Sequence, residues 1–122
     1  MKATDFSIEF GDPPNGRVVR LRVVPTLKEV RKGMSKKTMA YTEAHPAGEG
    51  PVATIVLAAT QLCVNLIAHE SVHAAYAMGR IGANLWERQV EHDEEERIAY
   101  PTGEVAAAVG RVLLDAGYTL KW

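Results

Sequence analysis

The chain has 122 residues, of which 47% are hydrophobic and 24% charged, and its formal net charge is −1. This length fits a single domain over residues 1–122, and the composition is typical of a soluble globular protein. The near-neutral charge gives no indication of a nucleic-acid or membrane partner. One cysteine, Cys63, excludes an intrachain disulfide, and the N-terminus lacks a signal-peptide pattern, so we expect a cytoplasmic protein.

The first third of the chain predicts a loop, a strand and a short helix. Residues 11–16, Gly-Asp-Pro-Pro-Asn-Gly, are turn formers and predict the loop. Residues 17–24 alternate basic and apolar side chains, which indicates a half-exposed strand. Thr26 is followed three residues later by Glu29, a spacing typical of a capping box. We therefore expect a short helix that ends near Gly33.

The middle of the chain predicts two further strands joined by a turn. Residues 38–45 form the second predicted strand. Pro46–Pro51 contains two prolines and two glycines and predicts the turn. Val52–Leu57 is rich in β-branched residues and predicts the third strand.

Two long helices are predicted in the second half of the chain. The first begins near Thr60 and runs to about Gly79, a natural C-cap. The second begins in the acidic run 91–96, where carboxylates suit the helix dipole, and continues to about Asp115. Pro101 is expected to kink or divide it. Together the elements predict an α+β fold, with a small sheet packed beside two long helices.

The clearest chemical signal is an H-E-x-x-H motif in the first long helix, at His69-Glu70-Ser71-Val72-His73. Residues four apart lie on one helix face, so both imidazoles can bind one metal ion. Zinc accepts imidazole nitrogen, keeps a position for water in catalytic sites, and lowers the pKa of that water to about 7. Glu70 lies about 60° around the helix from His73 and can take the proton as water attacks a carbonyl. The alternative is a pair of structural histidines, which would need other partners if buried.

A catalytic zinc needs a third protein ligand, and we expect a carboxylate of the second long helix. Small residues recur in that helix at helical spacing and would let it approach the motif helix closely; they are Ala99, Gly103, Ala106 and Gly110. Glu96, three residues before Ala99, is the predicted ligand. Glu95 is its rival, and Glu94 is expected to face away. The remaining histidines are His45 and His92, and His92 and Asp93 are next in line as ligands.

These motifs resemble the gluzincin family of metallopeptidases, whose third ligand is a Glu within E-x-x-x-D on the next helix. Glu96-Arg97-Ile98-Ala99-Tyr100 is similar to the E-x-x-A-D form, with Tyr100 where the family has Asp. The sequence also resembles minimal zincins of phages and mobile elements, over about residues 52–113. The resemblance implies a zincin-like minimal fold, bound zinc and a peptide or protein substrate. In the family the Asp orients a zinc-bound histidine, and the Tyr100 hydroxyl can accept the same bond. Alternatively, Tyr100 is a half-buried core residue.

Other segments have two interpretations each. Val52–Leu57 either receives the substrate as an added strand or forms a core strand, or does both. Tyr41, Tyr76 and Tyr118 are candidates for stabilising an oxyanion, although packing explains them as well. The basic stretch Lys28–Lys37 either contacts an acidic partner or is a solvated helix face.

Three classes of function follow from these observations. The first is a zinc-dependent hydrolase, most directly a peptidase. The second is a zincin fold that keeps its metal but has little turnover and acts as a binding module. The third is a structural protein without metal.

Overall fold

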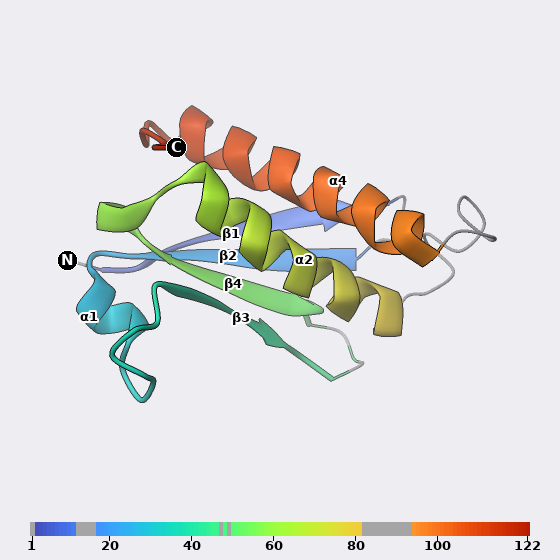
Figure 1. Cartoon of the computed structure of the whole chain (residues 1–122), viewed down its shortest axis with the longest axis horizontal. Coiled ribbons are helices and arrows are strands. Elements are labelled where there is room, and N and C mark those ends of the chain that lie inside the picture. Colours follow the sequence, from blue (N-terminus) through green and yellow to red (C-terminus); the bar gives the residue numbers. More distant parts are fainter. Residues whose placement is uncertain (1, 12–16, 47, 49, 82–93) are drawn as a thin grey trace.

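The computed structural model describes residues 2–11, 17–46, 48, 50–81 and 94–122, and for residues 80–81 and 94–98 the description covers the backbone alone. A four-stranded sheet is covered on one face by two long antiparallel helices (Figure 1). The elements in chain order are β1 (Thr4–Phe10), β2 (Arg17–Val24), α1 (Leu27–Val30), β3 (Ala40–Ala44), β4 (Ala53–Ala58), the 3-10 turn η1 (Ala59–Gln61), α2 (Val64–Ile81) and α4 (Glu94–Asp115). The predicted α+β fold is confirmed. In the described part of the chain, no helix is long and apolar enough to cross a bilayer.

The sheet is mixed, with strand order β1-β2-β4-β3. β2 and β4 are parallel, whereas β1 and β3 each pair antiparallel with their neighbour. Parallel strands need a crossover connection, and here the crossover carries α1 and β3. β4 therefore lies between β2 and β3, and β3 forms one edge of the described sheet.

β1 was not among the predicted strands. Its alternation was visible in the sequence, because Phe6, Ile8 and Phe10 are spaced by two. These side chains pack against the main core, while the opposite face carries Asp5, which bonds Arg22 of β2 through two contacts of 2.8 and 3.0 Å. The Arg22 guanidinium lowers the pKa of Asp5 through this hydrogen bond.

The core lies between the sheet and the two long helices. Alternate residues of β1, β2 and β4 face α2 and α4, as the period of two requires. The largest of these buried side chains, with their helix partners, are Ile8, Phe10, Val19, Leu21, Val23, Ile55, Leu57, Ile67, Met78, Val105, Val109 and Leu113. A smaller cluster on the opposite face packs α1 against the sheet and contains Val24, Val30, Val56 and Ala58.

The motif helix α2 differs from its predicted bounds at both ends. Residues 59–61 form the 3-10 turn η1, and α2 itself begins at Val64. The Cys63 thiol lies where a capping oxygen usually does, and its Sγ accepts the backbone N–H of Leu66 at 3.4 Å. Gly79 lies inside the helix, which continues to Ile81, so the predicted glycine C-cap is wrong.

The second long helix, α4, is continuous through Pro101. The predicted division at this proline does not occur. The proline ring is fully buried, so its packing offsets a backbone cost of about 3 kcal/mol. The helix ends at Asp115, and Gly117 follows in the left-handed region at φ 94°, with Tyr118 N–H donating to Leu113 C=O at 3.0 Å.

The predicted stripe of small residues in α4 is covered only in its second half, where Ala106 and Gly110 are half-buried and Ala106 packs against the main core. Ala99 and Gly103 are exposed, and a Cβ built on Gly103 would meet nothing within 4 Å. Buried residues of α4 instead follow the spacing of Pro101, Val105, Val109 and Leu113. These larger side chains dominate the packing of α4 on the core because they remove more apolar surface from water than Ala or Gly would.

The short helix α1 begins after Thr26 as predicted, but the capping box does not form. Thr26 is extended, at φ −140° and ψ 168°, and its side chain makes no capping bond to the backbone. Its hydroxyl instead donates to the Glu29 carboxylate at 3.3 Å. The chain leaves the helix through Gly33 in the left-handed region, at φ 77°.

Candidate metal centre

The H-E-x-x-H residues lie on two sides of α2. His69 and His73 are on its exposed side, and 66% of the His69 side chain is accessible. Glu70 points toward the sheet and is 4% exposed. Because α2 is a regular helix over the motif, the spacing of four that the sequence predicted brings both imidazoles to one face.

The distance between the two imidazole rings suits a shared zinc ion. Their centroids are 5.2 Å apart and their planes are inclined by 66°. A tetrahedral zinc with Zn–N bonds of about 2.0–2.1 Å requires ring centroids about 5 Å apart, because each centroid lies about 1.1 Å behind its ligating nitrogen. Two imidazoles at this distance on an accessible face therefore fit this metal.

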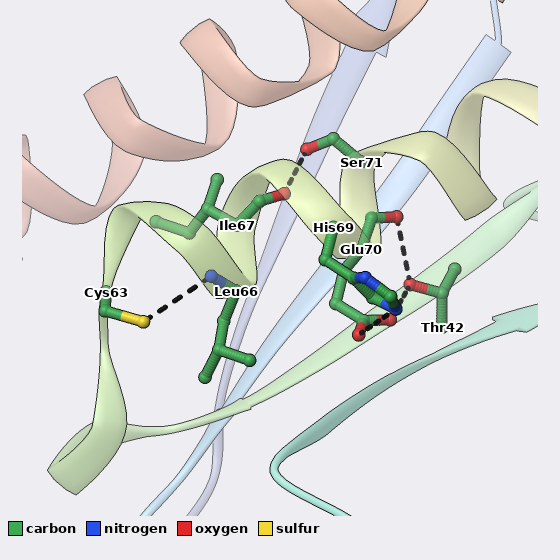
Figure 2. Close-up of polar contacts among 7 residues, drawn as sticks. All are labelled: Thr42, Cys63, Leu66, Ile67, His69, Glu70 and Ser71. Atoms are coloured by element: carbon green, nitrogen blue, oxygen red, sulfur yellow. Dashed lines mark hydrogen bonds and ion pairs between the residues drawn. The ribbon is translucent and has the colours of Figure 1, made fainter. Parts of the chain in front are cut away.

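The Glu70 carboxylate is held between α2 and the edge strand β3. The Thr42 hydroxyl of β3 donates to Glu70 Oε1 at 2.8 Å and lies 3.2 Å from the Glu70 carbonyl oxygen (Figure 2). The other carboxylate oxygen, Oε2, is 4.0 Å from His69 Nε2. Ser71 points to the other side of the helix, where its hydroxyl donates to Ile67 C=O at 2.6 Å. One carboxylate oxygen is thus fixed by Thr42 while the other lies beside a candidate metal ligand.

A pocket of about 330 Å³ opens beside these residues. Its lining comes from the start of β3, the segment before it and the first turns of α2, and consists of Lys37, Thr38, Met39, Ala40, Asn65, Leu66, His69 and Glu70. The pocket therefore brings the predicted base and one predicted ligand together with a cationic and several apolar side chains. Sequence reasoning missed Thr42 and these lining residues. Thr42 and Glu70 are 28 positions apart, and they come into contact only because β3 lies beside α2.

The predicted third ligands lie outside the described side chains. The backbone of Glu94, Glu95 and Glu96 forms the first turn of α4, but nothing describes where their carboxylates lie, and His92 and Asp93 precede the described range. Among the side chains that the structure describes, no three His, Cys, Asp or Glu residues are placed to hold a metal ion. Ala99 and Gly103, the stripe residues nearest to Glu96, are exposed, so close packing of small residues does not support Glu96 as the ligand. The resemblance to E-x-x-A-D remains as its support.

The structure shows where each candidate tyrosine lies, which the sequence could not decide. Tyr100 is 43% exposed, which agrees with its interpretation as a half-buried residue. Tyr41 packs on the α1 side of the sheet and Tyr118 against the main core. Tyr76 is 54% exposed and follows His73 by three residues on the same face of α2. Of the three oxyanion candidates, Tyr76 is the one that shares a face with the histidines.

His45 is held on the face of the sheet opposite to Glu70. Along β3, Ala40 and Thr42 face α2, so the alternation directs His45 to the other side. There its Nε2 lies 2.8 Å from the Thr54 hydroxyl. His45 is therefore not a ligand of a metal bound by His69 and His73.

The strand predicted to receive a substrate is the wrong one. β4 (Ala53–Ala58) is paired with β2 on one side and β3 on the other, so it has no unpaired edge. His45 N–H donates to Val52 C=O at 2.9 Å, and bonded and outward-facing residues alternate along an antiparallel ladder. The peptide groups of Ala40, Thr42 and Ala44 consequently point away from β4, at the outer edge of β3.

Comparisons of the chain with protein-family models, with curated proteins and with solved structures find no match. The function of this chain is therefore inferred from its own residues. These are two imidazoles at zinc spacing, a buried carboxylate held by a hydroxyl, a pocket beside them and an edge strand along that pocket.

Proposed function

We propose that this chain is a zinc-dependent hydrolase, most directly a peptidase of gluzincin-like chemistry, with His69 and His73 as metal ligands. The observation that carries the proposal is the 5.2 Å separation of the two rings beside the Glu70 carboxylate. When bound, zinc would supply the Lewis acid that makes a water molecule acidic near neutral pH. The exposed side of α2 leaves room for water and substrate next to both imidazoles.

Glu70 acts as the general base in this proposal. Its Oε1 accepts the Thr42 hydroxyl, so the side chain is held in one orientation, with Oε2 toward His69. Burial keeps bulk water from the carboxylate except through the pocket that it lines. A base oriented in this way can take a proton from an attacking water and deliver it to the leaving nitrogen of an amide. Tyr76 is the described candidate for stabilising the developing oxyanion.

The experiment that tests the proposal is removal and return of the metal. Protein purified without added metal is expected to contain about one zinc per chain, as a mononuclear catalytic site requires. Dialysis against a chelator should remove the zinc together with hydrolysis of a denatured protein substrate, and added zinc should restore both. A chain that folds without zinc and does not take it up contradicts the proposal.

Thr42 is expected to position the base without binding the metal. Thr42→Val keeps the shape of the side chain but removes the hydroxyl that Glu70 accepts, so kcat should fall about 10–100-fold, the usual cost of losing such a supporting bond. The buried oxygen left without a donor should also lower the free energy of unfolding by about 1–3 kcal/mol. Thr42→Ser, which restores the hydroxyl, should recover both kcat and stability. Equal zinc content in all three proteins is expected from elemental analysis, and a loss of zinc in Thr42→Val would contradict the positioning role.

The outer edge of β3 is expected to bind an extended peptide as an added strand. Ala44→Pro removes an N–H that points outward and leaves the hydrogen bonds to β4 intact. Losing one backbone hydrogen bond to the substrate should lower kcat/KM about three- to tenfold, with little change in the melting temperature. Ala44→Val, which keeps the N–H, is the matched control. Unchanged kcat/KM in Ala44→Pro would show that the substrate does not pair with this edge.

A further inference from the structure

A basic segment adjoins the proposed active site. Residues 28–37 contain five cationic side chains and one carboxylate, Glu29, which gives the segment a charge of +4 in a chain whose formal net charge is −1. The rest of the chain is therefore net acidic. Four of the cations in the segment are exposed: Lys28, Lys32, Lys36 and Lys37.

The fifth cation, Arg31, fixes the segment next to the pocket. Its Nε donates to Thr38 C=O at 2.8 Å, and its Nη2 donates to Met39 Sδ at 3.2 Å. Thr38 and Met39 both line the pocket that contains Glu70. Arg31 thus closes the loop on itself and holds Lys37 at the pocket, since Lys37 directly precedes these residues.

The cations continue away from the pocket along the same segment. Lys37 lines the pocket of about 330 Å³ together with His69 and Glu70. A second depression, of about 620 Å³, is lined by Lys28, Glu29, Arg31 and Lys32. Lys37 thus places positive charge at the first pocket, and Lys28, Arg31 and Lys32 place it at the second.

We propose that this basic segment selects peptide substrates with acidic residues next to the cleaved bond. The inference rests on the proposed function, because it takes the pocket at Glu70 as a substrate pocket. β3 runs from Ala40 at the pocket to Ala44. A peptide paired antiparallel to β3, the more stable pairing, runs from Ala44 toward Ala40, so the residues that follow the cleaved bond enter the basic side. Lys37 is then the specificity-determining residue for the first of them.

The binding test uses Glu70→Gln protein loaded with zinc, so that peptide binding is measured without turnover. A fluorescent decapeptide with four glutamates is compared, by anisotropy, with the same peptide carrying glutamine at those positions. The acidic peptide is expected to bind about five- to tenfold more tightly at low ionic strength, with the difference shrinking in high salt. Adding Lys37→Glu should abolish the preference. Adding Lys2→Glu, an equal change of charge on an exposed residue before β1 at the other side of the sheet, should preserve it.

The cleavage test uses wild-type zinc protein and a randomised peptide library whose products are sequenced. Aspartate and glutamate should be enriched after the cleaved bond, and Lys37→Glu should shift the enrichment to lysine and arginine. Acid-selective binding without any cleavage would support the inference and contradict the peptidase proposal. Cleavage without acidic enrichment at these positions would leave the peptidase in place and overturn the inference. Tighter binding of a single-stranded oligonucleotide than of the acidic peptide would also overturn it.

Discussion

His69→Ala and His73→Ala are each expected to abolish stoichiometric zinc, because each removes one of two imidazoles that lie 5.2 Å apart on one face of α2. A single remaining imidazole cannot enclose a zinc ion, so hydrolysis should be lost with the metal. Glu70→Gln should behave differently. The glutamine keeps an oxygen that can accept the Thr42 hydroxyl but cannot take a proton, so zinc should stay while kcat falls about 10²–10⁴-fold.

Metal ligands and the general base are told apart because losing a ligand removes zinc, whereas losing the base removes activity alone. Elemental analysis and turnover are measured on the same preparations, with circular dichroism to show that each variant folds. His45→Ala is the matched control, since His45 bonds Thr54 on the opposite face of the sheet and should keep both zinc and activity. Glu70→Gln with undiminished turnover would leave a different base. If the wild type and Glu70→Gln both keep zinc and neither turns over substrate, the metal-containing binding module is favoured.

Much of the fold could be predicted because local patterns and tertiary packing agree in most elements. The alternation in residues 17–24 is reflected in β2, where Val19, Leu21 and Val23 are buried toward the long helices. The β-branched run before the motif is buried at every position, because β4 is a central strand covered on both faces. β1 was missed although Phe6, Ile8 and Phe10 alternate, because the charged and polar residues between them resemble a surface segment. The division predicted at Pro101 does not occur, because a proline signal is local while its tolerance inside a helix depends on burial against the rest of the core.

The site was predictable where its chemistry lies within one helix. His69, Glu70 and His73 lie within about one helical turn, so helix geometry by itself brings their side chains close together. Thr42 could not be found in the same way, because its contact with Glu70 depends on β3 being the strand beside α2. Of the two interpretations of residues 52–57, the core strand is confirmed, and the substrate-receiving strand is wrong for a related reason. Sequence shows that a strand precedes the motif helix, but whether that strand is central or an edge depends on strand order.

The remaining prediction concerns the carboxylate that completes the metal site. α4 begins at Glu94 and is helical from there, so three consecutive glutamates stand at its start. Successive residues of a helix are about 100° apart, and therefore one of the three at most can share a direction with the two histidines. Zinc binding should accordingly depend strongly on a single glutamate, and the resemblance to E-x-x-A-D selects Glu96, with Glu95 as its rival.

Glu96→Ala is expected to lose zinc almost entirely, because the substitution removes both a negative charge and a coordinate bond. Glu95→Ala should cost about 10–100-fold in zinc affinity if Glu95 supports a ligand, and should still fill with zinc at saturating concentration. Glu94→Ala should bind like wild type, as should Glu104→Ala, an exposed carboxylate further along the same helix. Equilibrium zinc titrations of the four variants decide between the carboxylates.

A metal-free Glu95→Ala beside a normal Glu96→Ala would move the ligand by one residue. Normal binding in every variant would place the ligand elsewhere, with His92 and Asp93 next to be substituted, and the gluzincin-like assignment would fall, since it depends on a helical glutamate that follows the motif.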